Sequence, residues 1–180
     1  FVAGAPIKQY GALLAGTLAA GVVAIAAFPH RMERLLVFLD PSKDPTNTGY
    51  HISQALIAIG SGGVLGRGIG HSYQIYGYLP EAANDSIFAV IGEEFGLLGA
   101  TVVIGLFVLI VQRGLLIAKN APDTFSRLLA LGITLWLGFQ AIINIAAMLS
   151  LVPLTGIPLP FISYGGSSLM LSLVGIGILL

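Results

Sequence analysis

The sequence contains no cysteine and very little charge: lysine, arginine, aspartate and glutamate together make up 9% of its 180 residues. The absence of cysteine excludes disulfides, thiolate metal ligands and a cysteine nucleophile. The formal net charge is zero, which gives no support to nucleic-acid binding. A soluble domain usually has about 25% charged residues and must keep much of its surface polar. So small a charged fraction argues against a water-soluble fold.

The chain consists largely of long apolar runs. Hydrophobic residues make up 56% of the chain, and the mean hydropathy is +0.94. The runs are continuous and do not alternate, which favours membrane-spanning helices over a membrane β-barrel. A helix needs about 20 apolar residues to cross a bilayer. We expect such helices at residues 10–28, 86–112 and 128–149, with a fourth over residues 167–180.

The sequence therefore predicts a single all-α integral membrane domain over residues 1–180. The chain begins without methionine and ends inside an apolar run, so we expect it to be the C-terminal half of a longer protein. Arg113, Lys119 and Arg127 lie in the expected connector 113–127 and indicate that this connector is cytoplasmic. The long loop 29–84 and the turn 151–166 then lie on the extracytoplasmic side.

The loop 29–84 carries one helical pattern and one glycine-rich stretch. Apolar residues at helical spacing predict a short amphipathic helix over residues 50–61, lying at the membrane interface. Six glycines and Arg67 follow within residues 60–70. This stretch fits neither the dinucleotide-binding nor the P-loop pattern. Close backbone packing is the simpler interpretation, although glycine amides together with Arg67 would also make a partial cradle for a pyrophosphate.

Half of the eight acidic residues fall within residues 79–99: Glu81, Asp85, Glu93 and Glu94. Carboxylates at a membrane boundary are costly and commonly functional. Asp85 precedes an apolar helical run, so it is a candidate N-cap, a candidate general base, or both. Glu81 is either a solvated loop charge or part of the same site. Glu93 and Glu94 point about 100° apart on a helix, so at least one should face protein or a water-filled cavity.

The remaining polar residues have structural interpretations that compete with functional ones. The histidines show no metal-ligand spacing and are expected at the interface: His30, His51 and His71. The serines near residue 165 are explained by helix capping and turns unless a base lies beside them. Gln140 and Asn144 are four residues apart on one face of a predicted helix, so that face should meet protein. We interpret these two amides as interhelical hydrogen-bond partners rather than substrate ligands.

Three long segments together resemble one protein family. They are GYHISQALIAIGSGGVLGRGIG, LPEAANDSIFAVIGEEFGLLG and GIPLPFISYGGSSL. Each is similar to a segment of the SEDS family (shape, elongation, division and sporulation), which includes the FtsW, RodA and SpoVE types, and they occur in the family's order and spacing. Departures are Asn84 and Ser86, where the family often has Thr and Phe, and Arg67 in a usual lysine position. The pattern slightly favours the division type, FtsW, over RodA.

The resemblance implies a ten-helix protein in the bacterial cell membrane, of which this chain would be the last four spans. Family members polymerise lipid II: the 4-hydroxyl of one disaccharide attacks the anomeric carbon of another, and undecaprenyl pyrophosphate leaves. The resemblance assigns Asp85 as the general base. It also implies substrate-binding roles for a set of matching positions: Gln54, Arg67, Glu81, Glu94, Ser163, Tyr164, Ser167 and Ser168.

The same resemblance implies a class B penicillin-binding protein as partner, within the divisome or elongasome. It implies no protein metal site and no certain cofactor, while allowing a divalent cation, Mg²⁺ or Mn²⁺, at the pyrophosphate. Two alternatives to the enzyme remain open from the sequence: a lipid II flippase and a divisome scaffold without chemistry. The uncharged centres of the spans favour the enzyme, because a flippase needs a polar path through the membrane.

Overall fold

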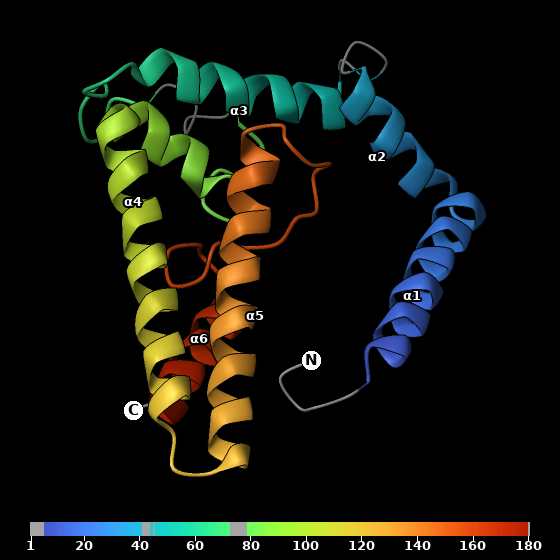
Figure 1. The fold of residues 1–180 in the computed structure, drawn as a ribbon. Helices are drawn as coiled ribbons and strands as arrows, with labels where there is room; N and C mark the ends of the chain where they lie inside the picture. The colour runs from blue at the N-terminus through green and yellow to red at the C-terminus, as the bar shows by residue number, and fades with distance from the viewer. Residues whose placement is uncertain (1–5, 41–43, 45, 73–78, 180) are drawn as a thin grey trace.

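The computed structural model describes residues 6–40, 44, 46–72 and 79–179, and within these ranges the chain is helical without a β-strand. The all-α expectation is confirmed for this part of the chain. Figure 1 shows the arrangement of its helices, which are α1 (Ile7–Ala27), α2 (Pro29–Leu39), α3 (Thr48–Gly62), α4 (Ile87–Asn120), α5 (Thr124–Met148) and α6 (Gly166–Leu179).

Among the described residues, three helices are long and apolar enough to cross a membrane by their length and composition, namely α1, α4 and α5, and α6 is apolar but shorter. Their boundaries differ from the expected ones at the connector 113–127. α4 continues past Gln112 to Asn120, and α5 already begins at Thr124. Asp123 defines this start, because its carboxylate accepts the N–H of Ser126 at 2.9 Å as an N-cap does.

α4 is broken at Gly96, whose backbone angles (φ 65°, ψ −162°) lie outside the helical region and suit glycine. Residues 87–95, the rising arm, run up towards α3, and residues 97–120, the descending arm, run back down beside α5 (Figure 1). Leu97 and Leu98 follow the break and donate their amides to the carbonyls of Gly63 and Val64, at 2.9 and 3.2 Å. The segment expected as one span, 86–112, therefore reverses direction within its first turns.

The described part of the segment 29–84 contains two helices, where the sequence predicts one. α3 contains the expected amphipathic helix and buries Ile52, Ala55 and Ala58 from its apolar stripe. α2 was not predicted, because Pro29 was interpreted only as the end of the preceding span. Pro29 also begins α2 at its first position, where the missing N–H of proline has no partner to lose.

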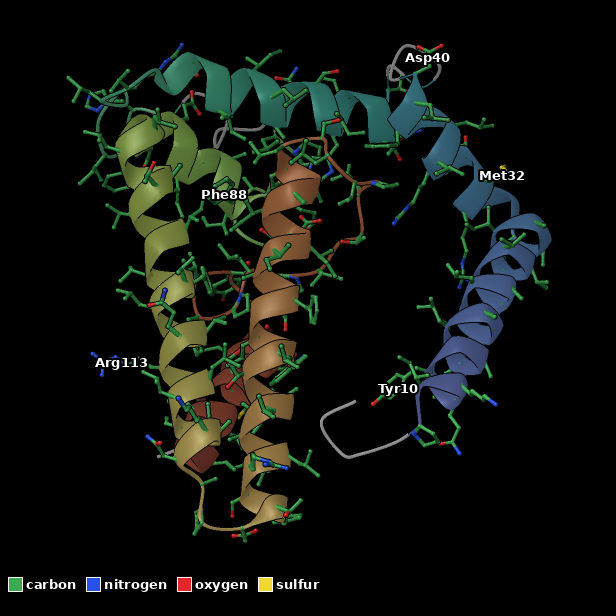
Figure 2. All side chains as sticks on the ribbon, viewed as in Figure 1. Tyr10, Met32, Asp40, Phe88 and Arg113 are labelled. Carbon is green, nitrogen blue, oxygen red and sulfur yellow. The ribbon has the colours of Figure 1, made fainter. Side chains whose placement is uncertain are left out.

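Small residues bring the helices of the central bundle close together. A Cβ on Gly114 of the descending arm would lie 2.1 Å from Thr134 Oγ1 on α5. A Cβ on Gly62 of α3 would lie 1.9 Å from the carbonyl oxygen of Gly92 on the rising arm. Phe88 is 2% exposed and lies on the rising arm, beside α5 (Figure 2). Helices without large side chains between them can approach this closely, which stabilises packing in lipid.

α1 lies apart from this bundle (Figure 1). None of its residues is buried, and its main neighbour is α2. α2 in turn leads towards α3, which crosses over the upper ends of α4 and α5 (Figure 1). The functional residues expected from the sequence lie on α3, α4 and α6 and in the segments that connect the helices, and not on α1.

Candidate functional site

The acidic turn comprises residues 79–86 and leads directly into the rising arm of α4. Its first residue, Leu79, is buried. Glu81 adopts φ 51°, a left-handed conformation that is uncommon for a residue other than glycine. Its carbonyl accepts the amides of Asn84 at 2.9 Å and Ser86 at 3.3 Å. Its carboxylate accepts a hydrogen bond from the Asn84 side chain. These bonds fold the turn tightly and present Asp85 at its end.

α5 anchors the acidic turn from one side. The side-chain nitrogen of Asn144 donates to the carbonyl of Asp85 and to the carbonyl of Ile157, each at 2.7 Å. Gln140, one turn earlier on α5, donates to the carbonyl of Pro158 at 3.0 Å. The expectation that both amides face protein is confirmed. Their partners are backbone carbonyls, so α5 holds both the acidic turn and the segment that follows α5.

The segment 149–165 anchors the acidic turn from a second side. Ser163 donates its hydroxyl to the carbonyl of Asn84 at 2.6 Å and accepts the amide of Leu159 at the same distance. The amide of Tyr164 donates to the carbonyl of Ala83 at 2.8 Å. The structure thus brings the side chain of Ser163 and the backbone of Tyr164 against the acidic turn. Tyr164 itself is 83% exposed.

Ser86, and not Asp85, occupies the N-cap position of α4, so the interpretation of Asp85 as an N-cap is wrong. The Ser86 side chain makes no capping bond either. Its hydroxyl lies 2.5 Å from His51 Nε2 on α3, 3.0 Å from the carbonyl of Pro80 and 3.4 Å from Asp85 Oδ1. The Asp85 carboxylate therefore does not cap the start of α4, and it can make other contacts.

Asp85 is half-buried, and burial raises the pKa of its carboxyl group above the ordinary value. His51 acts in the opposite direction and lowers it, whereas the nearby Glu81 carboxylate adds to the increase. Burial also lowers the pKa of His51, against the opposing effect of Asp85 and Glu81. A carboxylate with a raised pKa is a stronger base than one in water, which suits it to accept a proton from a hydroxyl group.

A second polar cluster lies higher, where the glycine-rich stretch meets the rising arm. Glu93 is 1% exposed and accepts the hydroxyl of Ser72 at 2.5 Å and Nη1 of Arg67 at 3.4 Å. Arg67 also donates Nε to the carbonyl of Ser61 at 3.3 Å. The expectation that one of the paired glutamates faces protein is confirmed for Glu93. Its charge is balanced by an arginine, as buried charges require.

The backbone amides of the glycine-rich stretch are directed at the helix break. The amides of Arg67 and Gly68 donate to the carbonyls of Glu93 and Glu94, each at 3.0 Å, and the amide of Gly70 donates to Glu94 Oε1 at 2.9 Å. A Cβ on Gly66 would lie 2.1 Å from the carbonyl oxygen of Glu94. Close packing is therefore what these glycines provide. Of the amides that would have cradled a pyrophosphate, those of Arg67, Gly68 and Gly70 donate to α4, and that of Gly66 donates to the carbonyl of Gly62 on α3.

The remaining positions implied by the resemblance lie on α3 and α6. Gln54 is half-buried on α3, one turn after His51. Ser167 and Ser168 lie in the first turn of α6. The side chain of His30 lies outside the described residues, and His71 is exposed on the glycine-rich stretch. No group of three or more His, Asp and Glu side chains within the described ranges could hold a metal ion. The donor set here does not by itself fit a divalent cation.

Sequence reasoning missed the partners of Asp85. His51 was assigned to the interface and Ser86 was noted only as a departure from a family pattern, yet the two contact each other next to Asp85. Asn144 was expected to bond within the protein, but its contact with Asp85 was not foreseen. No local pattern links these residues, because α3, the acidic turn and α5 are far apart in the chain.

The fold and the site define a class: a multi-pass helical membrane protein with a half-buried carboxylate held between helices. Comparison with known proteins gives the family. A family model described as Cell cycle protein, which groups FtsW, RodA and SpoVE, matches residues 1–180. The chain belongs to this family, and the SEDS resemblance is confirmed.

Two curated relatives illustrate the match. A probable peptidoglycan glycosyltransferase FtsW of Geobacter sp. (strain M18) is 48% identical over 151 residues, which are 84% of this chain and 41% of the relative. The stage V sporulation protein E of Bacillus subtilis (strain 168) is 43% identical over 180 residues, which are 100% of this chain and 49% of the relative. The chain thus spans less than half the length of these relatives. The relatives' names favour the FtsW type.

Two solved structures share the fold. One belongs to a peptidoglycan synthase complex that coordinates polymerization and crosslinking, with a TM-score of 0.68 and 30% identity over 94% of this chain and 48% of that chain. The other is a mutant of the rod shape determining protein RodA of Thermus thermophilus, with a TM-score of 0.54 and 35% identity over 70% of this chain and 38% of that chain. Both support a SEDS fold for the described helices.

Proposed function

We propose that the protein containing this chain is a peptidoglycan glycosyltransferase that polymerises lipid II into glycan strands, with Asp85 as general base. The observation that carries the proposal is the placement of Asp85: its carboxylate is half-buried, its pKa is raised by burial, and it is not used as a helix cap. The names of the relatives support the same activity, since several are called peptidoglycan glycosyltransferase FtsW.

The reaction needs one proton acceptor next to the attacking hydroxyl. The 4-hydroxyl oxygen of the acceptor disaccharide forms a bond to the anomeric carbon of the donor, and its proton passes to the Asp85 carboxylate. The bond between the anomeric carbon and the pyrophosphate oxygen breaks, and undecaprenyl pyrophosphate leaves with the bonding electrons. A raised pKa favours the transfer to Asp85. No step is routed through a metal ion, because the described donor set does not form a metal site.

The surroundings of Asp85 have distinct roles in this proposal. Glu81 adds negative potential beside the base, and its tight turn fixes the approach to Asp85. The residues that would contact the substrate are Tyr164, Gln54, Ser167 and Ser168. Arg67 and Glu94 hold the glycine-rich stretch against the helix break. We therefore assign them a role in shaping the site rather than in proton transfer.

We further propose the membrane orientation and the partner. The basic residues Arg113, Lys119 and Arg127 lie towards the end of the α4–α5 pair that is opposite the acidic turn, as Figure 2 shows for Arg113. The positive-inside rule then puts the acidic turn on the extracytoplasmic face. The complete protein would have ten membrane helices and would work with a class B penicillin-binding protein. Support for the partner comes from the similar chain in a peptidoglycan synthase complex.

The test is lipid II polymerisation by the purified full-length protein with its penicillin-binding partner. Asp85→Asn and Asp85→Ala should each lower glycan formation at least about 100-fold, the usual contribution of a positioned base or more. Glu33→Gln, which removes an exposed carboxylate from α2, should leave the rate unchanged. A folded Asp85→Ala protein with the wild-type rate would refute the assignment. A lipid II flipping assay on the same preparation separates polymerisation from transport.

A further inference from the structure

His51 reaches the acidic turn from a different element. It lies in the first turn of α3, which crosses above the rising arm (Figure 1). Its Nε2 atom lies 2.5 Å from Ser86 Oγ, and Ser86 is 0% exposed. Because the serine is fully buried, the imidazole and the hydroxyl interact without competing water. This contact makes His51 a neighbour of Asp85 across one serine side chain.

A count of protons favours one direction for this hydrogen bond. The Ser86 hydroxyl carries one proton, and three acceptors surround it: His51 Nε2 if unprotonated, the carbonyl of Pro80 at 3.0 Å and Asp85 Oδ1 at 3.4 Å. If His51 took the proton, both oxygens would lose it. If His51 instead donates Nε2–H to Ser86 Oγ, the hydroxyl proton remains available to the two oxygens. The second arrangement gives one of the two oxygens the hydroxyl proton, whereas the first gives it to neither.

We propose that His51 is a positioning residue for Asp85: it donates Nε2–H to Ser86, which leaves the serine hydroxyl free to donate towards the Asp85 carboxylate, and on protonation its charge keeps that carboxylate ionised. This inference rests on the proposed function, since it gives the general base a second residue that tunes it. His51 touches neither the sugar nor the pyrophosphate in this scheme.

The charges that face His51 are few. Asp85 and Glu81, both in the acidic turn, raise its proton affinity against the effect of burial. α2 also packs on α3, but its Arg34 is directed at the carbonyl of Leu154, at 3.3 Å. α5 contributes the neutral amide of Asn144 on this side. The electrostatic exchange is therefore between one imidazole and two carboxylates.

The pH dependence follows with a definite sign. The pKa of His51 is lowered by burial, so the ring is neutral at neutral pH and becomes charged only at a lower pH than an ordinary histidine does. Once charged, it lowers the pKa of Asp85. The base then stays deprotonated to a lower pH than burial alone would allow. The acid limb of the rate profile in the wild-type protein should accordingly lie at lower pH than in a protein without the histidine charge.

The decisive variant is His51→Gln, which can still donate an N–H but cannot become charged. In the full-length protein with its partner, the rate of lipid II polymerisation is measured from about pH 5 to about pH 8. Relative to its own plateau rate, the variant should lose about threefold more activity than wild type at the acid end, a shift of roughly half a pH unit. His51→Asn serves as a second uncharged variant if the glutamine does not fit.

Variants of Ser86 test the other half of the proposal. Ser86→Ala keeps the histidine charge but removes the hydroxyl that donates to Asp85, so it should lower the plateau rate severalfold. It should also move the acid limb to higher pH, because a hydrogen bond to the ionised carboxylate lowers the pKa of Asp85. Ser86→Thr keeps the hydroxyl and should restore the plateau. Thermal unfolding and retention of the partner establish that each variant is folded.

The outcomes separate this inference from the proposed function. Coincident acid limbs for His51→Gln and wild type would overturn the inference, and so would a wild-type plateau in Ser86→Ala. A drop of the plateau in His51→Gln without any shift of the acid limb would reduce His51 to a structural residue and would also overturn it. An active Asp85→Asn protein would instead refute the general base itself.

Discussion

At the scale of single residues, the site depends on side chains that hold backbone carbonyls. Asn144 is 1% exposed, and its one amide nitrogen satisfies the carbonyls of Asp85 and Ile157. Its Oδ1 atom is buried and has no hydrogen-bond partner among the described residues. Rotating the amide by half a turn would bring that oxygen against two carbonyl oxygens, so the orientation is fixed. Asn144 thereby determines where the backbone of the base lies.

Asn144→Ala should therefore destabilise the protein more than a change at Gln140. The alanine leaves two part-buried carbonyls without a donor, a cost of about 2–4 kcal/mol. Gln140→Ala frees only the carbonyl of Pro158, in a half-buried position, and should cost about 1 kcal/mol. Thermal unfolding of the two full-length variants in the same detergent measures the difference. Equal midpoints would contradict a clamping role for Asn144.

The sequence predicted the chemistry of these residues better than their contacts. The four-residue spacing of Gln140 and Asn144 indicated a common protein-facing side, and the structure confirms it. The partner of Asn144 lies 59 residues earlier in the chain, and periodicity along one helix contains no information about such a distant turn. The contact between His51 and Ser86 escaped prediction for the same reason.

At the scale of elements, the helix break in α4 and the glycine-rich stretch form one unit. The stretch donates amides to the carbonyls just before Gly96, and the residues just after Gly96 donate amides back to the stretch. Each side satisfies groups that the other leaves without helical partners. The reversal of α4 is stable because of this exchange, and the rising arm carries the acidic turn at its foot.

Gly66→Ala should disrupt this unit, whereas Gly63→Ala should do so much less. Both glycines have positive φ, 79° and 56°, so both alanines add backbone strain of about 1 kcal/mol. Only at Gly66 would the new methyl group also collide, 2.1 Å from the carbonyl oxygen of Glu94; at Gly63 nothing lies within 4 Å. Gly66→Ala should therefore lower the unfolding midpoint further and increase proteolysis of residues 60–72. Equal effects of the two substitutions would show that crowding is not what matters.

Elements with a strong local signal were predictable, and those defined by contacts were not. Long apolar runs identified α1, α4 and α5. The break at Gly96 was missed, because Gly96 is one of several glycines within an apolar run and only the docking of another segment distinguishes it. α2 was missed because charged and apolar residues mix in a segment that begins and ends with proline.

At the scale of the whole molecule, α1 lacks the packing that the other spans have. It has no buried residue, and its neighbour among the described helices is mainly α2. Yet Ala12, Gly16 and Ala20 recur every four residues along it. Such a row of small residues permits close helix–helix contact in a membrane. Because the chain covers 41% and 49% of two relatives, we expect this row to pack against a helix in the remaining part of the protein.

Gly16→Leu in the full-length protein tests that expectation, with Gly21→Leu as its matched control. In the described structure both glycines have open space within 4 Å, so neither leucine should disturb the bundle formed by α3, α4 and α5. A leucine at Gly16 would overpack the expected contact and lower stability by about 1–3 kcal/mol. Gly21 points about 140° away from Gly16 at 100° per residue, so its leucine should face lipid without cost. Thermal unfolding in detergent and in lipid nanodiscs compares the two. If both variants unfold at the wild-type temperature, α1 is surrounded by lipid, and the row of small residues packs against nothing.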